Sequence, residues 1–418
     1  MKNHFSFAFT TLLLAGAASA QGLYYIGGSE TQESLPLRWT AGVAAFYDDN
    51  VNAGNPFFGV EDQGTAGFNP YVGLSFINTN PQTTWDVFVR LGLVYYLDAP
   101  EGVNATNSQS RAGVNLTHRF NERLRFSSRN FISYELNPDY SVGVANAAQV
   151  GETFFWTSDN SIGYRWTERL GTYTGLILNS FSYADNNNND IFTWTFYNQF
   201  RYQISPQTVL TADYRYGQTT SSGFAPESTD QFFLLGAEHR FSPTTLGIIR
   251  AGAQFREIDS SPDAIFEEGE TFTSPYLEAA LNSQLTQEFS VRAYARYGIE
   301  SVDAVQVLPT NDLVVFNDTQ TLRIGVSGEY AFSPMVSIFG GVDYIPTSYS
   351  GGQLLNAPGG STPDLSNELL NANIGLSVRF NEMLTGTVAY NYTTAMSDDL
   401  EYQDYDRNRI SLGVNAEF

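Results

Sequence analysis

The sequence of 418 residues contains no cysteine, which excludes a disulfide scaffold, a lipoprotein anchor and a thiolate metal site. Lysine occurs once, at Lys2, and histidine only three times. After position 20 the chain has 20 arginines and 44 acidic residues, a formal charge of −24 (20 minus 44). Because phosphate binding needs a basic surface, this charge argues against a nucleic-acid partner.

Long hydrophobic runs are also missing, since no stretch approaches the ~18 uninterrupted apolar residues of a membrane-spanning helix. The amino terminus has one lysine, an apolar run from Phe5 to Ala15 and the small-residue site Ala18-Ser19-Ala20. This pattern predicts a secretory signal peptide over residues 1–20. Aromatic residues make up 15% of the chain, and an exported, aromatic-rich chain without long apolar runs favours alternating β-strands.

Apolar and polar residues alternate over unusually long stretches. At the carboxyl terminus, Ile410, Leu412 and Val414 fall on one face of a strand, while Arg409 and Ser411 fall on the other. Similar alternation occurs around residues 85–95 and 322–332. Strands of soluble proteins usually have ~5–6 residues, whereas ~9–11 tilted residues are needed to cross a bilayer. The pattern therefore favours a transmembrane barrel, with apolar side chains outward and polar ones inward; a soluble secreted β-protein is the alternative.

Eight short polar pairs interrupt the alternation, each preceded by an aromatic residue, Leu or Ile in most cases. Asn, Ser or Thr at the first position can accept hydrogen bonds from the following backbone, and Pro at the second presets φ for a type I turn. The pairs therefore predict tight turns with a girdle of aromatic side chains beside them. They are Asn80-Pro81, Asn121-Glu122, Thr167-Glu168, Ser205-Pro206, Ser242-Pro243, Thr286-Gln287, Ser333-Pro334 and Asn381-Glu382.

Longer polar connections separate these turns, at residues 48–65, 97–106, 137–151, 185–189, 218–228, 258–271, 302–316, 347–366 and 397–404. Eight turns at one end and nine connections at the other predict an all-β antiparallel barrel of about 18 strands. Its termini are expected at the tight-turn end. The predicted organisation is a signal peptide (1–20), a short periplasmic segment (21–36) and an outer-membrane barrel (37–418).

The first predicted strand and its exit, LRWTAGVAAFYDDNVNAG, contain the string Tyr47-Asp48-Asp49-Asn50-Val51. This segment resembles the beginning of the type two family of bacterial beta-barrel porins, in which a similar string follows the first strand. The plan of signal peptide, uninterrupted barrel and terminal Phe is also similar. The resemblance implies an outer-membrane barrel, discussed either as a porin or as part of exopolysaccharide export. It implies no catalytic residue and no cofactor.

Candidate sites for catalysis and metal binding are few. His118 and His239 each precede the phenylalanine of a tight turn by two residues, and alternation points both toward lipid or its interface. We expect them to pack there, since a Ser-His hydrolase would need a carboxylate and a nucleophile beside the histidine. In the segment from Asp185 to Asp190, the glycine and the bidentate Glu of a calcium loop are missing, which favours a polar hairpin loop.

Acidic segments at 257–270 and 397–406 could bind divalent ions that bridge to anionic lipid head groups. Solvated charge that keeps the mouth of a barrel open and soluble is the favoured explanation. We therefore predict no metal site, no cofactor and no enzymatic activity.

The inner face carries the strongest functional signal. Alternation places the following arginines inward: Arg90, Arg111, Arg125, Arg165, Arg201, Arg215, Arg250, Arg292, Arg296, Arg323, Arg379 and Arg409. Inward carboxylates are fewer and include Asp86, Glu135, Asp213, Glu238 and Glu329. Two interpretations remain open. The arginines could favour anionic or hydrogen-bonding solutes in the channel, or they could pair with carboxylates across strands and stiffen the wall.

These features predict an outer-membrane channel for passive diffusion of small hydrophilic solutes, because barrels of ~16–18 strands are too wide for side chains to fill. The alternative is a structural or export component of surface polysaccharide assembly. The selectivity is expected to depend on a positive ladder formed by Arg292, Arg296 and Arg323. The terminal Phe418 is expected to be read by the barrel assembly machinery, and the outer face to contact outer-membrane lipid.

Overall fold

The computed structural model describes residues 34–51, 64–99, 104–136, 152–183, 186–260, 269–300, 305–307, 313–355, 362–397 and 404–418. Regular secondary structure in these ranges consists of β-strands. No helix in the described ranges is long and apolar enough to cross a membrane. The predicted signal peptide and most of the predicted segment 21–36 lie outside the described residues.

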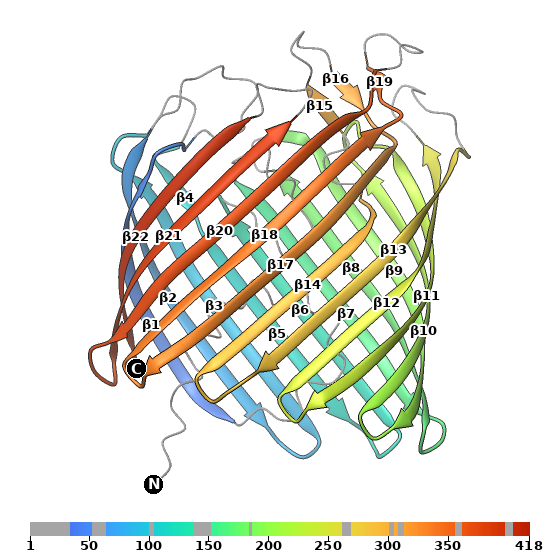
Figure 1. The fold of residues 1–418 in the computed structure, drawn as a ribbon, viewed down its shortest axis with the longest axis horizontal. Coiled ribbons are helices and arrows are strands. Elements are labelled where there is room, and N and C mark those ends of the chain that lie inside the picture. The colour runs from blue at the N-terminus through green and yellow to red at the C-terminus, as the bar shows by residue number, and fades with distance from the viewer. Residues whose placement is uncertain are drawn as a thin grey trace.

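Nineteen strands form one antiparallel sheet (Figure 1), in chain order β1 (Leu35–Asp48), β2 (Thr65–Thr79), β3 (Thr83–Tyr96), β4 (Thr106–Ser108), β5 (Ser110–Arg119), β6 (Leu124–Glu135), β7 (Thr153–Arg165), β8 (Leu170–Tyr183), β9 (Asn186–Ser205), β10 (Thr208–Ser221), β11 (Glu227–Ser242), β12 (Thr245–Ser260), β13 (Thr271–Gln284), β14 (Phe289–Ile299), β17 (Asp318–Ser333), β18 (Val336–Ser350), β20 (Leu365–Arg379), β21 (Leu384–Ser397) and β22 (Tyr405–Glu417). A separate small sheet contains β15 (Val305–Val307), β16 (Leu313–Val315) and β19 (Gln353–Leu354).

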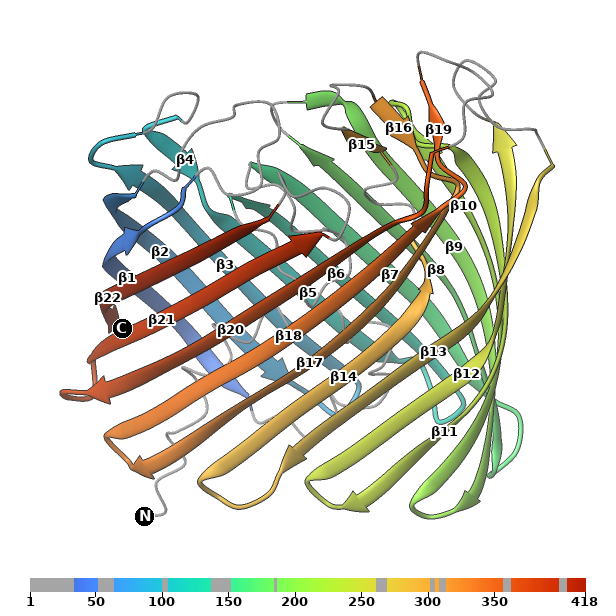
Figure 2. The ribbon, with the colours of Figure 1, turned by 45° about the horizontal axis from the view of Figure 1, so that its top comes forward.

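The large sheet closes on itself and confirms the prediction of an 18-stranded barrel. β4 and β5 both pair with β3 and are separated only by Gln109, whose amide donates to the Gly92 carbonyl, so together they occupy one strand position. Nine residue pairs between β1 and β22, from Thr40–Glu417 to Asp48–Arg409, join the two ends of the sheet. The closed, tilted ring is visible in Figure 2. Closure matters because it removes unpaired strand edges.

All eight tight turns occur where the polar pairs predict them. At Asn121, the side-chain oxygen accepts hydrogen bonds from the amides of Arg123 and Leu124, at 2.8 and 2.9 Å. Asn381 binds the equivalent amides of its own turn, both at 2.8 Å. The polar residue at the first position therefore satisfies the backbone of the turn, which is the physical reason for its recurrence.

Aromatic side chains project outward beside the turns, among them Phe120, Phe241 and Phe380, which are 58%, 65% and 60% exposed. His118 packs edge-on against Phe120, with ring centroids 4.7 Å apart, and His239 packs against Phe241 in the same way at 4.6 Å. Tyr–Trp and Tyr–Phe pairs occupy the equivalent positions of two sister turns, at 4.6 and 4.9 Å. The two histidines thus have the interfacial packing geometry that alternation predicts.

Several long connections differ from the prediction, because strands and small elements extend into them. β9 begins at Asn186, so most of the expected hairpin loop at 185–189 is strand. The segment 302–316 contains β15 and β16, and the segment 347–366 contains β19. Polar side chains do not prevent a strand from continuing beyond the apolar band, because backbone pairing is satisfied there as well.

The inner face at this end is partly apolar, which the alternation of polar residues did not predict. Val315 of β16 packs against Ile258 of β12 in a buried cluster, while Val314 and Phe316 pack against Tyr349 of β18. The small sheet lies at the long-connection end (Figure 1), and its residues contact inward-facing side chains of the wall. The apolar run Leu313–Phe316 in an otherwise polar connection was the available signal.

Candidate solute passage

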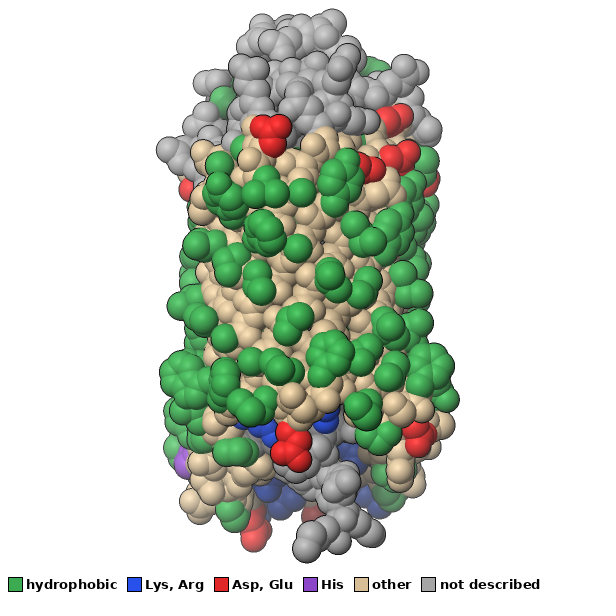
Figure 3. All heavy atoms as spheres, turned by 90° about the vertical axis from the view of Figure 1, so that its left-hand side faces the viewer, with side chains coloured by type: hydrophobic (Ala, Val, Ile, Leu, Met, Phe, Trp, Pro, Cys, Tyr) green, Lys and Arg blue, Asp and Glu red, His purple; other side chains and the backbone are tan. Residues whose placement is uncertain are grey.

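The two faces of the barrel have opposite character. On β12, Ile249 and Phe255 point outward and are 52% and 43% exposed, whereas Arg250, Gln254 and Arg256 lie buried on the inner face. Figure 3 shows one side of the molecule, on which apolar side chains cover the band between the two ends and acidic side chains lie near the ends. This arrangement follows from the period of two along each strand.

A network of ion pairs crosses the inner face of β9 to β13. Arg250 of β12 is fully buried and lies 2.8 Å from Glu278, 3.1 Å from Glu238 and 3.4 Å from Asp213. Arg215 binds both carboxylate oxygens of Glu278, at 2.8 and 3.2 Å. These side chains shield one another from water, so the ion pairs lie in a region of low dielectric. There, removing one partner leaves a buried charge that is not compensated.

The network extends to β9 and depends on a glycine. Arg201 of β9 binds Glu238 of β11 through both terminal nitrogens, at 2.5 and 2.6 Å. At Gly236, which pairs with Arg250 in the register, a Cβ atom would lie 2.6 Å from Cγ of that arginine. Glycine at this position therefore leaves the space in which the Arg250 side chain crosses β11.

The expected ladder of Arg292, Arg296 and Arg323 is only partly present. Arg296 of β14 and Arg323 of β17 are direct partners in the register, so they lie side by side as predicted. However, Glu300 lies 2.8 Å from Arg323 and 3.7 Å from Arg296, and it neutralises part of their charge. Arg292 lies half-buried opposite Ser327.

Glu300 follows the end of β14 and is itself buried. Burial alone would raise the pKa of its carboxyl, but Arg323 and then Arg296 outweigh burial and hold that pKa below its ordinary value. Glu300 therefore remains a carboxylate at neutral pH.

Other inward arginines also have acidic partners. Arg111 forms an ion pair with Glu135, as cross-strand pairing predicts. Two further ion pairs involve residues that were not among the sequence candidates: Arg256 binds Asp230 at 2.9 Å, and Arg407 binds Asp48 at 2.5 Å. Alternation could have identified Glu278, Asp230 and Arg256, which share the parity of neighbouring polar residues on their strands. For much of the wall, the structure thus favours the interpretation that the arginines pair and stiffen it.

Arg90 and Arg409 stack more closely on aromatic rings than the ion-paired Arg201 and Arg215, which lie 5.5 and 5.8 Å from the ring centroids of Tyr173 and Tyr276. The guanidinium carbon of Arg90 lies 3.8 Å from the ring centroid of Tyr71, and that of Arg409 lies 4.2 Å from the ring centroid of Phe46. The remaining candidates Arg125, Arg165 and Arg379 lie near the tight turns, at the strand ends. Among the described residues, no group of three or more His, Asp or Glu side chains could hold a metal ion.

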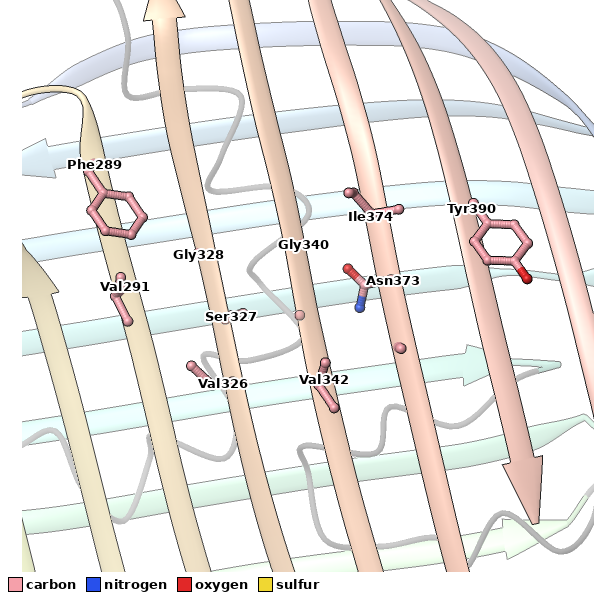
Figure 4. A pocket seen from close by; sticks show the side chains of 12 residues that line it. Phe289, Val291, Val326, Ser327, Gly328, Gly340, Val342, Asn373, Ile374 and Tyr390 are labelled. Carbon is pink, nitrogen blue, oxygen red and sulfur yellow. The ribbon is translucent and has the colours of Figure 1, made fainter.

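A shallow apolar groove lies on the outer face of β14 to β21. Its floor contains Gly328 of β17 and Gly340 of β18, which pair directly in the register, and it is lined by Phe289, Ile374 and Tyr390 among others. Figure 4 shows Phe289 at one side of the paired glycines and Ile374 and Tyr390 at the other. Since Ile374 and Tyr390 belong to the exposed apolar face, the groove is separate from the inner wall.

Phe418 completes the closure of the barrel at the tight-turn end. Its amide donates to the Trp39 carbonyl, at 2.8 Å, and its carbonyl accepts from the Trp39 amide, at 3.0 Å. The side chain points outward and is 62% exposed. It is thus accessible on the apolar face, where the predicted assembly signal requires it.

No family model matches the chain, and no curated protein matches it. Among solved structures, the chain is similar to OpdK of Pseudomonas aeruginosa crystallised with vanillate, with a TM-score of 0.46 and 11% identity over 91% of this chain and 99% of that one. Similarity to OccAB4 of Acinetobacter baumannii has a TM-score of 0.44 and 11% identity, over 94% and 100% of the two chains. The siderophore receptor PirA of Pseudomonas aeruginosa gives a TM-score of 0.39 and 9% identity, over 93% and 81%. Similarity at this level bears on neither the solute nor the transport properties of the chain.

Proposed function

We propose that the protein is an outer-membrane channel for passive diffusion of small hydrophilic solutes. The observation that carries the proposal is a closed barrel of 18 strands with an apolar outer face and a charged inner face. Outward apolar residues suit outer-membrane lipid, and a barrel of this size is too wide for wall side chains to fill. The likeness of the segment around Tyr47–Val51 to type two porins agrees with this function. The inner wall supplies binding groups, so neither an enzymatic reaction nor a cofactor is part of the proposal.

The test is single-channel recording of the purified protein in planar bilayers. Discrete conductance steps are expected, with a folded protein that migrates differently on gels before and after boiling. The control is the same preparation after heat unfolding, which should give no steps. A folded protein without conductance would contradict the channel.

The alternative of a structural or export component is favoured by one observation, the apolar packing of β16 inside the long-connection end. A mouth narrowed by such a segment would suit a barrel that opens only with a partner. The same recordings separate the two functions: replacing Phe316 by Ser should loosen this packing and raise conductance if the segment restricts an otherwise passive channel. Absence of conductance in both proteins would support the alternative.

A further inference from the structure

The inner arginines fall into two classes that occupy different parts of the wall. On β9 to β17, Arg201, Arg215, Arg250 and Arg323 each form an ion pair with a buried or partly buried carboxylate. On β3 and β22, Arg90 and Arg409 instead stack on aromatic rings contributed by β2 and β1. The first class is compensated by acids. In the second class, Arg90 has donors that a solute could use.

The Tyr71 ring on which Arg90 stacks packs closely against β1. Tyr71 pairs with Gly42 of β1 in the register, and a Cβ atom at Gly42 would lie 2.5 Å from the Tyr71 ring, so the ring covers the glycine closely. The guanidinium carbon of Arg90 lies 3.8 Å from the centroid of the same ring. Within the described part of the chain, no residue forms a hydrogen bond with this guanidinium. Stacking leaves the in-plane N–H donors directed away from the ring.

The charge beside Arg90 is not balanced locally. Arg90 pairs with Arg111 in the register, and Glu135 binds Arg111 through both carboxylate oxygens. The three groups therefore include two guanidinium ions and one carboxylate, which is already occupied. An anion at Arg90 meets a positive site rather than a competing salt bridge.

Aromatic side chains continue from this site along the inner wall. Phe88 precedes Arg90 by two residues on β3, and its ring covers Gly113 of β5. The ring centroids of Phe88 and Phe131 lie 6.3 Å apart, and those of Phe131 and Phe155 lie 6.2 Å apart. Phe88 is only partly buried, so it offers apolar surface next to the guanidinium.

A second arginine–aromatic stack lies toward the long-connection end, but its ring is buried, since Phe46 is only 5% exposed and packs in a hydrophobic cluster with Tyr96. Arg409 stacks on Phe46, whose ring packs edge-on against Tyr96 at 5.7 Å, while the neighbouring Asp48 is bound by Arg407 through both carboxylate oxygens. Arg409 pairs with β1 at residue 48, and Arg90 is linked to β1 at residue 40 through Gly73. Eight residues of strand correspond to ~26 Å, so this buried stack is separate from the stack at Arg90.

We propose that Arg90 with Tyr71 and Phe88 forms a binding site for small organic carboxylates that carry a flat apolar body. A guanidinium fixed by stacking presents two parallel N–H groups that match a carboxylate. The adjacent rings contact the body of the solute. The inference rests on the proposed channel function, and it assigns solute binding to the wall of β2 to β6 rather than to the ladder around Arg323.

The test measures block of chloride current by sodium benzoate and by sodium acetate in planar bilayers. In wild type, benzoate should reduce the current at lower concentration than acetate. Arg90→Gln should raise the half-blocking benzoate concentration about tenfold or more, because a charge-assisted, bidentate contact is lost. Phe88→Ala should raise it for benzoate but not for acetate. Arg165→Gln, which removes a positive charge at the exposed tight-turn end of β7, is the matched control and should change neither value.

Arg90→Lys keeps the positive charge but lacks the planar fork, so benzoate block should weaken while preference for chloride over sodium is retained. Every variant is first checked for the gel shift on boiling, and if Arg90→Gln does not fold, Arg90→Lys decides the question. Unchanged benzoate block in these variants would overturn the site while leaving the channel in place. Wild-type protein without conductance would instead contradict the channel itself.

Discussion

Replacing Glu278 by Gln tests whether the ion-pair network stabilises the wall. Glu278 is fully buried and accepts hydrogen bonds from Arg215 at 2.8 and 3.2 Å, from Arg250 at 2.8 Å and from the Tyr276 hydroxyl at 3.1 Å. The neutral amide keeps the shape but removes the charge that both guanidinium groups face.

The expected magnitude follows from what remains around each arginine. Breaking a buried pair by removing one partner typically costs about 3–5 kcal/mol. Arg250 retains Glu238 and Asp213, at 3.1 and 3.4 Å, whereas Arg215 loses its two hydrogen bonds to a carboxylate. We therefore expect a loss near the lower limit, about 3 kcal/mol, which corresponds to more than a hundredfold change in the unfolding equilibrium.

The assay is urea unfolding of the barrel in lipid vesicles, followed by tryptophan fluorescence. Glu329→Gln is the matched control, because Glu329 lies on β17 and is only partly buried, and its loss should stay within about 0.5 kcal/mol. Combining Glu278→Leu with Arg215→Met should recover part of the stability, since both charges are then removed together. Equal stability of the Glu278→Gln and Glu329→Gln proteins would refute the reasoning, because it would mean that water compensates these charges.

Three further predictions concern assembly, selectivity and pH. Deleting Phe418 removes its backbone bonds to β1, so the protein should be degraded or stall in the periplasm; cell fractionation checks this, and normal membrane levels would count against an assembly signal. Replacing Arg292, Arg296 and Arg323 together by Ser should shift the reversal potential in a salt gradient toward cations, and equal potentials would leave these arginines a purely structural role. The triple variant should also be less stable than wild type, because Glu300 loses its partners Arg296 and Arg323. Because the folded-state pKa of Glu300 is depressed, its ion pairs should stabilise the fold at every pH above the ordinary glutamate pKa of about 4.3, and this stabilisation should be lost as pH falls through the lower folded value. Unfolding of wild type and Glu300→Gln across pH measures this. A difference in stability between the two proteins that is lost above pH 5 would contradict it.

The barrel was predictable because its signals repeat along the whole chain. A turn such as that at Asn121 needs a side chain that binds the next amides, and the aromatic residue before it marks the end of the apolar band. Alternation across each strand then assigns the faces, since a strand buried toward lipid on one side cannot shift by one residue without exposing polar groups. Segments such as Leu313–Phe316 lack both signals, so their packing into the mouth depends on contacts with Ile258 and Tyr349, far away in sequence.

The binding properties of the wall were less predictable, because alternation gives the direction of a side chain but not its neighbours. Arg250 and Arg90 have the same parity on their strands, and from sequence they are equivalent. The register places Arg250 beside Glu278, whereas it places Arg90 opposite Arg111, whose carboxylate partner is already occupied.

Glycine positions complete the distinction between the two classes of arginine. Gly236 leaves room for Arg250 to cross β11 and reach several acids, so its charge is used within the wall. Gly42 leaves room for Tyr71 to lie flat against β1, and the flat ring holds Arg90 by stacking rather than by an ion pair. In both cases a glycine leaves space that is filled by a large side chain of the neighbouring strand. It follows that the charge available to a solute depends less on the number of inward arginines than on which of them have an acid or an aromatic ring beside them in the register.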